Sequence, residues 1–197
     1  MKETVKIFHK ALFLFLVAFS FNVHGKILSS GDSNAKVTVK VFSSLTCPAC
    51  ANFHSEIYYD LKRDFIDAGL VKFEHHPFPL DLAALNAEII LRCSNKDEKK
   101  FELLGIIYKK QNLWAVGSDI NKINESIKKI GSEFDMNDEK MNNCLKNDKS
   151  QDEILNQRIE AQKKYNIQST PTIYINEKKY SGKVDYKQFK KAIEKNL

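Results

Sequence analysis

The sequence has 197 residues, of which 43% are hydrophobic and 28% are charged. This composition is ordinary for a globular protein and excludes a fibrous, collagen-like or wholly disordered chain. The formal net charge is +6, from 31 basic and 25 acidic side chains, which is too mild and too dispersed to indicate nucleic-acid binding. Four cysteines are too few for a disulfide-dense small domain, so their placement carries more information than their number.

The first 25 residues have the features of an export signal. Three lysines precede an unbroken apolar run at residues 11–19, and residues 23–25 then offer a cleavage site before Lys26. A membrane anchor is the alternative, but a spanning helix needs about 20 apolar residues, roughly twice the length of this run. We expect residues 1–25 to be a signal peptide and the mature chain to reach a periplasmic or extracellular space, where disulfides persist.

A strand, a helix and a second strand are predicted next. Residues 36–43 are rich in β-branched side chains and alternate in polarity, which predicts the first strand of the mature chain. Apolar residues then recur mostly at every fourth position from Phe53 to Ile66, which predicts one helix that ends at Gly69. Residues 71–75 alternate again. This order is a β-α-β unit, whose two strands are expected to be parallel.

The middle of the chain is predicted to be helical. Residues 81–165 show helical periodicity and no convincing strand. Strand character returns at residues 172–175, and a polar turn leads to a second short strand at 179–182, which predicts a hairpin. Residues 186–196 are expected to form a last helix.

Two cysteines lie where the first predicted strand gives way to the first predicted helix, in the order Cys47-Pro48-Ala49-Cys50. Proline suits the first helical position, so Cys47 is expected near the N-cap and Cys50 in the first turn. Unpaired amide groups and the positive end of the helix dipole favour a thiolate at Cys47, and the thiolate is the form that attacks disulfides. Half of a zinc site and an inert structural disulfide are the alternatives at this point.

A proline that opens a strand far downstream, in Thr170-Pro171-Thr172, is at a position where a cis peptide bond can be accommodated. With this segment added, the chain resembles the thioredoxin superfamily, and more closely its exported DsbA-like branch. The segments that carry the resemblance are residues 44–54, 78–81 and 167–172.

The resemblance implies an α/β protein with a thioredoxin fold and an inserted helical domain. Residues 31–80 and 166–197 would form the discontinuous thioredoxin-like domain, and residues 81–165 would form the insertion. The implied nucleophile is Cys47 and the implied resolving thiol is Cys50.

The resemblance also implies that Pro171 is a cis-proline beside the two thiols and that Thr170 offers backbone groups to an extended peptide. Two positions depart from the pattern of this branch. Ala49 replaces a histidine that helps to hold the thiolate in many members, and Val41 replaces an acidic residue. The proton of the resolving thiol therefore needs another route.

The remaining cysteines and three histidines give less specific signals. Cys93 and Cys144 are predicted to form a structural disulfide in the helical block, with two free buried thiols as the alternative. His54, one turn after the second cysteine of the motif, either modulates the thiol pair or lies at the surface. His75-His76 is interpreted as a polar strand end and not as a metal site, because neighbouring strand residues point to opposite faces.

The predicted function is a protein thiol-disulfide oxidoreductase, without cofactor or metal, that oxidises cysteine-containing exported polypeptides through Cys47 and Cys50. A membrane partner would reoxidise it. An isomerase or reductase is the alternative, but exported isomerases of this superfamily usually add an N-terminal dimerisation module, and only about ten residues separate the expected cleavage site from the first predicted strand. A monomer is therefore expected. A metal-binding or copper-delivery module using Cys47, Cys50 and His54 is a third hypothesis.

Overall fold

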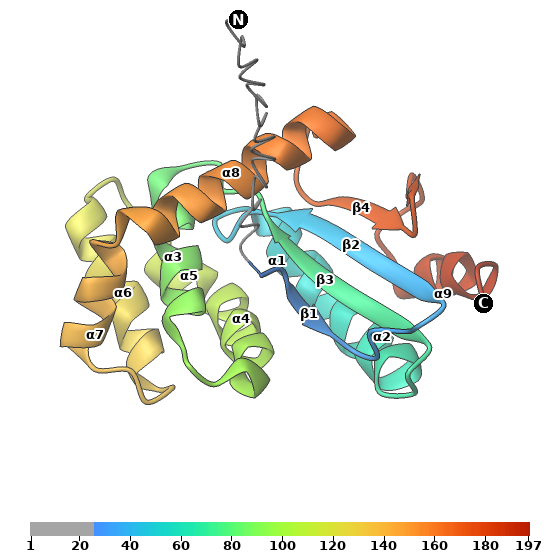
Figure 1. Cartoon of the computed structure of the whole chain (residues 1–197), viewed down its shortest axis with the longest axis horizontal. Coiled ribbons are helices and arrows are strands. Elements are labelled where there is room, and N and C mark those ends of the chain that lie inside the picture. The colour runs from blue at the N-terminus through green and yellow to red at the C-terminus, as the bar shows by residue number, and fades with distance from the viewer. Residues whose placement is uncertain (1–25) are drawn as a thin grey trace, which may run out of the picture.

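The computed structural model describes residues 26–197, so the predicted signal peptide at residues 1–25 lies outside the described residues. Within the described range, the centre is a five-stranded sheet with the order β1-β3-β2-β4-β5. The strands are β1 (Leu28–Ser30), β2 (Val37–Ser43), β3 (Val71–Pro77), β4 (Thr172–Ile175) and β5 (Lys178–Lys179). β2 and β3 are parallel, and every other neighbouring pair of these strands is antiparallel. The predicted β-α-β unit is confirmed, and its strands lie within the sheet (Figure 1).

The edges of the sheet differ from the sequence-based prediction. β1 precedes the segment predicted as the first strand, so a thioredoxin-like domain that starts at residue 31 omits one strand. Its three residues are too few to show an alternating pattern, and pairing with β3 fixes their conformation. At the other edge, β5 is Lys178–Lys179 and not residues 179–182. The reason is a tight turn, in which Asn176 has a φ of 54° and only two residues separate the paired positions Ile175 and Lys178.

One continuous helix connects β2 to β3 and covers one face of the sheet. It consists of α1 (Pro48–Phe53), η1 (His54–Tyr58), α2 (Tyr59–Leu61) and η2 (Lys62–Ile66), of which η1 and η2 are π-helical turns. Phe53, Ile57 and Leu61 are buried in one core with side chains of β2, β3 and β4. The predicted helix and its end near Gly69, which has a φ of 71°, are confirmed. The periodic apolar residues therefore fix which side of the helix faces the sheet.

The C-terminal helix, α9 (Tyr186–Glu194), packs in the same core through Phe189 and Ile193. It begins at an Asp185 cap, whose carboxylate accepts a hydrogen bond from the amide of Gln188 at 3.0 Å. The last predicted helix is thus confirmed, with its end two residues earlier than the sequence pattern indicates.

The other helices gather beside the sheet (Figure 1). They are α3 (Leu82–Cys93), η3 (Asp97–Lys99), α4 (Lys100–Lys109), α5 (Gln111–Trp114), α6 (Ile120–Ser132), α7 (Asp138–Leu145) and α8 (Asp148–Tyr165). As predicted, residues 81–165 contain no strand. Trp114 is buried in a core that these helices share. α8 runs back to the other face of the sheet, where Ala161 packs with Phe42 and Phe78.

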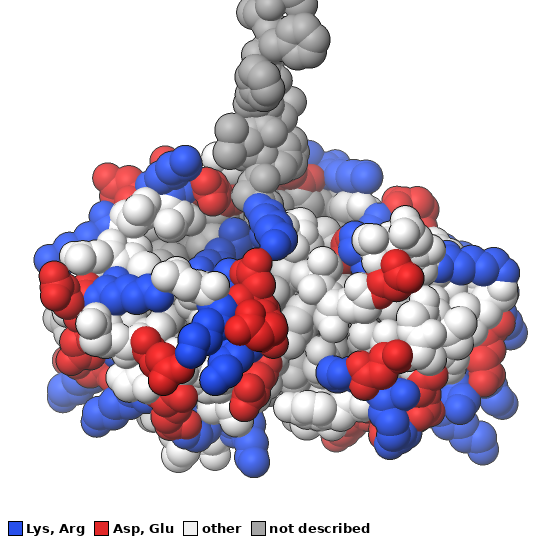
Figure 2. All heavy atoms as spheres, turned by 60° about the horizontal axis from the view of Figure 1, so that its bottom comes forward, with Lys and Arg blue, Asp and Glu red and all other residues white. Residues whose placement is uncertain are grey.

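Charged side chains of both signs are interspersed on the face drawn in Figure 2. Exposed pairs such as Lys26 with Asp97, at 2.9 Å, are typical of this surface and contribute roughly 0.2–1 kcal/mol each. In the part of the chain that the structure describes, no helix is both long enough and apolar enough to cross a membrane.

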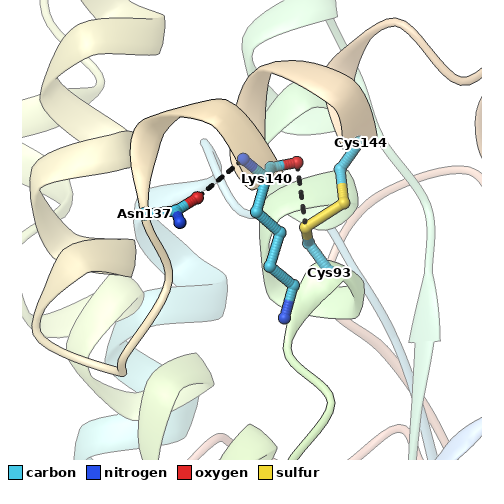
Figure 3. The surroundings of a disulfide bond; sticks show 4 residues. All are labelled: Cys93, Asn137, Lys140 and Cys144. Atoms are coloured by element: carbon cyan, nitrogen blue, oxygen red, sulfur yellow. Dashed lines mark hydrogen bonds between the residues drawn. A yellow bond between two sulfur atoms is a disulfide. The ribbon is translucent and has the colours of Figure 1, made fainter.

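A disulfide joins Cys93, the last residue of α3, to Cys144 in α7, which is the pairing expected from the sequence (Figure 3). The two Cα atoms are 6.0 Å apart, and the carbonyl oxygen of Lys140 lies 3.8 Å from Sγ of Cys93. The side chain of Asn137 accepts a hydrogen bond from the amide of Lys140 at 2.9 Å and so caps α7. The bridge therefore fastens a short, separately capped helix to the centre of the helical block.

We predict that the double variant Cys93→Ala/Cys144→Ala unfolds at a lower denaturant concentration than the oxidised wild type. The closed loop has a sequence separation of 51, for which chain entropy gives a loss of about 4 kcal/mol. Denaturant unfolding followed by circular dichroism measures the difference, and alkylation of Cys47 serves as a control that the rest of the fold is intact. A loss below about 1 kcal/mol would contradict the prediction.

Candidate active site

The structure places the two cysteines of the CxxC motif at the start of the helix that follows β2. Cys47 is the N-cap residue, with extended backbone angles, and Pro48 is the first helical residue. Both Cys47 and Cys50 are free thiols. Cys47 is partly exposed, whereas Cys50 is only 2% exposed and belongs to the core of the helical block. One thiol can therefore meet another molecule and the other cannot.

The loop that leads into Cys47 is held by the first helix of the helical block. The hydroxyl of Thr46 donates to Oδ2 of Asp81 at 2.7 Å, and Oδ1 of the same carboxylate accepts from the amide of Ala84 at 2.7 Å. Asp81 therefore caps α3 and fixes the loop at the same time. Asp81 lies in one of the segments that carry the family resemblance, but its residue type alone does not indicate this double role.

Gln111 holds the same loop from α5. Its side-chain amide donates to the carbonyl oxygen of Leu45 at 2.7 Å and to that of Cys47 at 3.1 Å. Gln111 is not predictable from the sequence, because a single glutamine on a predicted helix gives no signal of what it will contact. Together with Asp81, it fixes the position of the nucleophilic sulfur relative to both layers of the fold.

A segment far along the sequence completes the site. The peptide bond between Thr170 and Pro171 is cis, and the carbonyl oxygen of Thr170 lies 3.3 Å from Sγ of Cys47, to which it is hydrogen-bonded when the thiol is protonated. The hydroxyl of Thr172 donates to the carbonyl oxygen of Ser169 at 2.7 Å, which closes the turn around this bond. The structure thus brings Cys47, Thr170 and Pro171 together, as the sequence-based hypothesis requires.

The environment of Cys47 favours its anion. The hydrogen bond from the Cys50 thiol lowers the pKa of Cys47 most, burial opposes this effect, and the Thr170 hydroxyl and the amides of Cys50 and Ala49 lower the pKa further, to about 5. Cys47 is therefore mostly a thiolate at neutral pH. The amides and the neighbouring thiol supply the stabilisation, so Ala49 does not need to contribute a side chain.

Cys50 has the opposite character. Burial raises the pKa of the Cys50 thiol far above its ordinary value, and the hydrogen bond to Cys47 and the negative charge of Cys47 raise it further. The two thiols therefore titrate far apart, with a nucleophile outside and a protonated thiol inside. This is the division of labour that thiol-disulfide exchange through a CxxC pair needs.

His54 is buried, so the alternative that it lies at the surface is wrong. It is 3% exposed and its ring stacks on Tyr58, with the centroids 4.4 Å apart. Burial, together with the charge of His75, lowers the pKa of His54 to about 3. His54 is therefore neutral at physiological pH and cannot support the thiolate as a positive charge.

The interpretation of His75-His76 as a polar strand end is wrong for His75. Its ring is 2% exposed and lies between Ser43 and Glu88, whereas His76 points to the other side of the strand and bonds Glu74 at 2.9 Å. The partner Glu88 comes from α3, on a different layer, and this is why the sequence does not reveal the contact. The opposite directions of the two rings follow the expected alternation.

The residues of the metal-binding hypothesis are not assembled as a metal site. Among residues 26–197, no group of three or more histidine, cysteine, aspartate or glutamate side chains is arranged to hold a metal ion. The neighbours of Cys47 that stabilise its anion are backbone amides and the Thr170 hydroxyl, which are hydrogen-bond donors and not metal ligands.

We predict that Thr170→Val and Cys50→Ala both raise the pKa of Cys47, and that Cys50→Ala raises it more, because the Cys50 thiol is the larger cause of the shift. Ultraviolet absorbance of the thiolate and the pH dependence of alkylation measure the midpoint, which is expected at about 5 in the reduced wild type. A wild-type midpoint at the ordinary value of about 8.5 would contradict the assignment.

The same shift predicts how the stability of the reduced protein depends on pH. Because the folded pKa of Cys47 is depressed, its contribution is complete above the unfolded value of about 8.5. It is lost as the pH falls through about 5. Unfolding of the reduced protein between pH 4 and pH 8, compared with that of Cys47→Ala, isolates this contribution.

Comparisons with known proteins agree with this geometry. A family model described as "Thioredoxin" matches residues 24–195. "Disulfide bond formation protein D" of Bacillus subtilis is 32% identical over 177 residues, covering 85% of this chain and 75% of the relative.

A "Putative protein-disulfide oxidoreductase" of Rickettsia bellii is 31% identical over 163 residues, and the chain spans only 61% of that relative's length. The crystal structure of Wolbachia pipientis alpha-DsbA1 superimposes with a TM-score of 0.79 and 25% identity, covering 87% of this chain and 90% of that one. The chain therefore belongs to the thioredoxin superfamily and, within it, to the DsbA-like proteins.

Proposed function

We propose that this protein is a thiol-disulfide oxidase that donates the disulfide between Cys47 and Cys50 to cysteine pairs of exported polypeptides. The observation that carries the proposal is the unequal environment of the two sulfurs, with the pKa of Cys47 lowered to about 5 beside a buried, protonated Cys50. A stabilised thiolate favours the reduced pair, which makes the oxidised pair a stronger oxidant.

The size of this effect supports an oxidase. A thiol with a pKa about two units below pH 7 stabilises the reduced form by at most about 2.7 kcal/mol, or roughly 60 mV for a two-electron couple. Cys47 is partly exposed, so solvent screening reduces this figure. The stabilisation of the reduced form that remains still makes this cysteine pair more oxidising than one whose nucleophilic thiol has an ordinary pKa.

The reaction follows from the positions of the sulfurs. A substrate thiolate attacks Sγ of Cys47 in the oxidised enzyme, the bond to Cys50 breaks, and Cys50 leaves as a thiolate that takes up a proton. The second substrate thiolate then attacks the substrate sulfur of the mixed disulfide, and Cys47 leaves as the stabilised thiolate. The substrate loses two electrons and the enzyme gains them.

Thr170 and Pro171 would position the substrate chain. Their peptide bond lies against Cys47, so an extended peptide bound along this turn brings its own sulfur to the nucleophile. Export rests on the signal features of residues 1–25, and the regenerating partner would be a membrane protein that accepts two electrons. The protein would act as a monomer.

We predict that the oxidised wild type accelerates disulfide formation in a reduced, disulfide-dependent substrate and that Cys47→Ser abolishes this activity, because no other exposed thiol is described. The Cys93→Ala/Cys144→Ala variant is the matched control, since it removes the same kind of atom away from the site. Regain of substrate activity measures the rate. Equal activity of wild type and Cys47→Ser would exclude the proposed role of Cys47.

The reduction potential separates the oxidase from the isomerase or reductase alternative. We expect a value on the oxidising side of about −200 mV, whereas reducing thioredoxins lie near −270 mV. Equilibration with glutathione buffers, read out by alkylation and mass measurement, gives the potential. A value near that of the thioredoxins would show that the enzyme works as a reductase.

A further inference from the structure

A small cavity lies directly behind the buried thiol. Its volume is about 10 Å³, and its polar lining consists of Cys50, Ser43, His54, His75 and Tyr108. This volume is room for a single water molecule, and a buried water needs two to four polar partners, which this lining supplies. The rest of the lining is apolar.

A chain of hydrogen bonds leads away from the cavity. Oγ of Ser43 lies 3.2 Å from Nδ1 of His75, and Nε2 of His75 lies 3.0 Å from Oε2 of Glu88. All three side chains are 2–3% exposed. A second contact completes the charge balance, since Nε of Arg92 donates to Oε1 of Glu88 at 3.1 Å.

Glu88, at the end of this series of hydrogen bonds that is farthest from Cys50, determines which nitrogen of His75 carries a hydrogen. Burial alone would raise the pKa of Glu88, but the charges and hydrogen bonds of His75 and Arg92 lower it to about 2. An ionised carboxylate only accepts hydrogen bonds, so Nε2 of His75 carries a hydrogen and donates it to Glu88. Nδ1 of His75 then faces the Ser43 hydroxyl.

The other ionisable groups around the cavity do not compete for this proton. Burial lowers the pKa of His54 to about 3 and raises the pKa of Tyr108 well above its ordinary value, so both are neutral. Cys47, on the outer side, is the thiolate that takes part in the exchange itself. Ser43 and His75 are the remaining polar side chains of the lining besides Cys50.

We propose that Ser43, His75 and Glu88 form a buried proton relay for Cys50, connected to it by one water molecule in the cavity. The proposal deepens the proposed function, because only thiol-disulfide exchange requires Cys50 to change its protonation state. The sequence places an apolar residue, Val41, in the lining of the same cavity, so the relay supplies a base where the neighbouring strand position offers none.

When reduced enzyme resolves a mixed disulfide at Cys47, the Cys50 proton passes to the water, the water passes one to Ser43, and Ser43 passes its own to Nδ1 of His75. The Cys50 thiolate then attacks Sγ of Cys47, the bond to the bound sulfur breaks, and that sulfur leaves with the electron pair. In the opposite half-reaction, the Cys50 thiolate recovers the proton from His75. Glu88 and Arg92 remain charged throughout.

Reaction of the reduced enzyme with 5,5′-dithiobis(2-nitrobenzoate) distinguishes the reactions of the two thiols as two kinetic phases. The first thionitrobenzoate released reports attack by Cys47, and the second reports attack by Cys50 on the mixed disulfide. We expect Ser43→Ala, His75→Gln and Glu88→Gln to leave the first phase unchanged and to slow the second by about tenfold or more near neutral pH. The slowed phase should rise steeply with pH, since hydroxide then replaces the relay.

The adjacent residue pair provides matched controls. His76→Gln and Glu74→Gln remove the same chemical groups from the other side of β3 and should leave both phases within about twofold of wild type. A general loss of structure would slow both phases and change the circular dichroism spectrum. If His75→Gln fails to fold, Ser43→Ala, which removes a single oxygen atom, tests the proposed relay in its place.

A second phase that is unchanged in folded Ser43→Ala and His75→Gln, or slowed equally in the His76→Gln control, would overturn the relay. The outcome is independent of whether the enzyme is an oxidase or a reductase. The reduction potential decides that question, whereas the two phases report only the thiol chemistry that both activities share.

Discussion

The site depends on the hydrogen bond between two sulfurs that the fold treats unequally. Cys47 stands at the start of a helix, near the amides of Ala49 and Cys50, and Cys50 lies one turn further in, out of reach of solvent. Each sulfur shifts the other, because the Cys50 thiol donates to the Cys47 thiolate and the charge of Cys47 makes ionisation of Cys50 harder. The pair therefore behaves as one unit with a single negative charge at neutral pH.

The different exposure of the two sulfurs depends on both layers of the fold, the sheet and the helical block. Cys50 is buried in the core of the helical block, whereas Phe53, on the next turn, is buried against the sheet. The two cores therefore meet within one turn of helix. The loop before the helix is tied to the helical layer by Asp81 and Gln111, so the block added after β3 sets the position of the nucleophile as firmly as the sheet does.

Local patterns were sufficient to predict most of the sheet, the helix after β2 and the identity of the two reactive cysteines. Each of these follows from the spacing of apolar residues or from residues adjacent in sequence. Contacts between layers were not predictable. The burial of His54 depends on Gly105 of α4, where a Cβ atom would lie 3.3 Å from Nε2 of His54 and 2.6 Å from the Tyr59 hydroxyl. No residue pattern within either helix predicts this close contact between Gly105 and His54.

The buried carboxylate of Glu88 requires an explanation, because its charge lies out of contact with water. Removing a charge from water costs several kcal/mol, and replacing a buried ion pair by well-packed apolar residues is often neutral or stabilising. Apolar residues lie close by, since Val41, Phe73 and Leu104 line the cavity that its partner His75 also lines. Stability alone therefore gives no reason for a charged group here. A buried sulfur that must release a proton gives such a reason. An ionised carboxylate behind a histidine holds the imidazole in the orientation in which its free nitrogen can accept that proton.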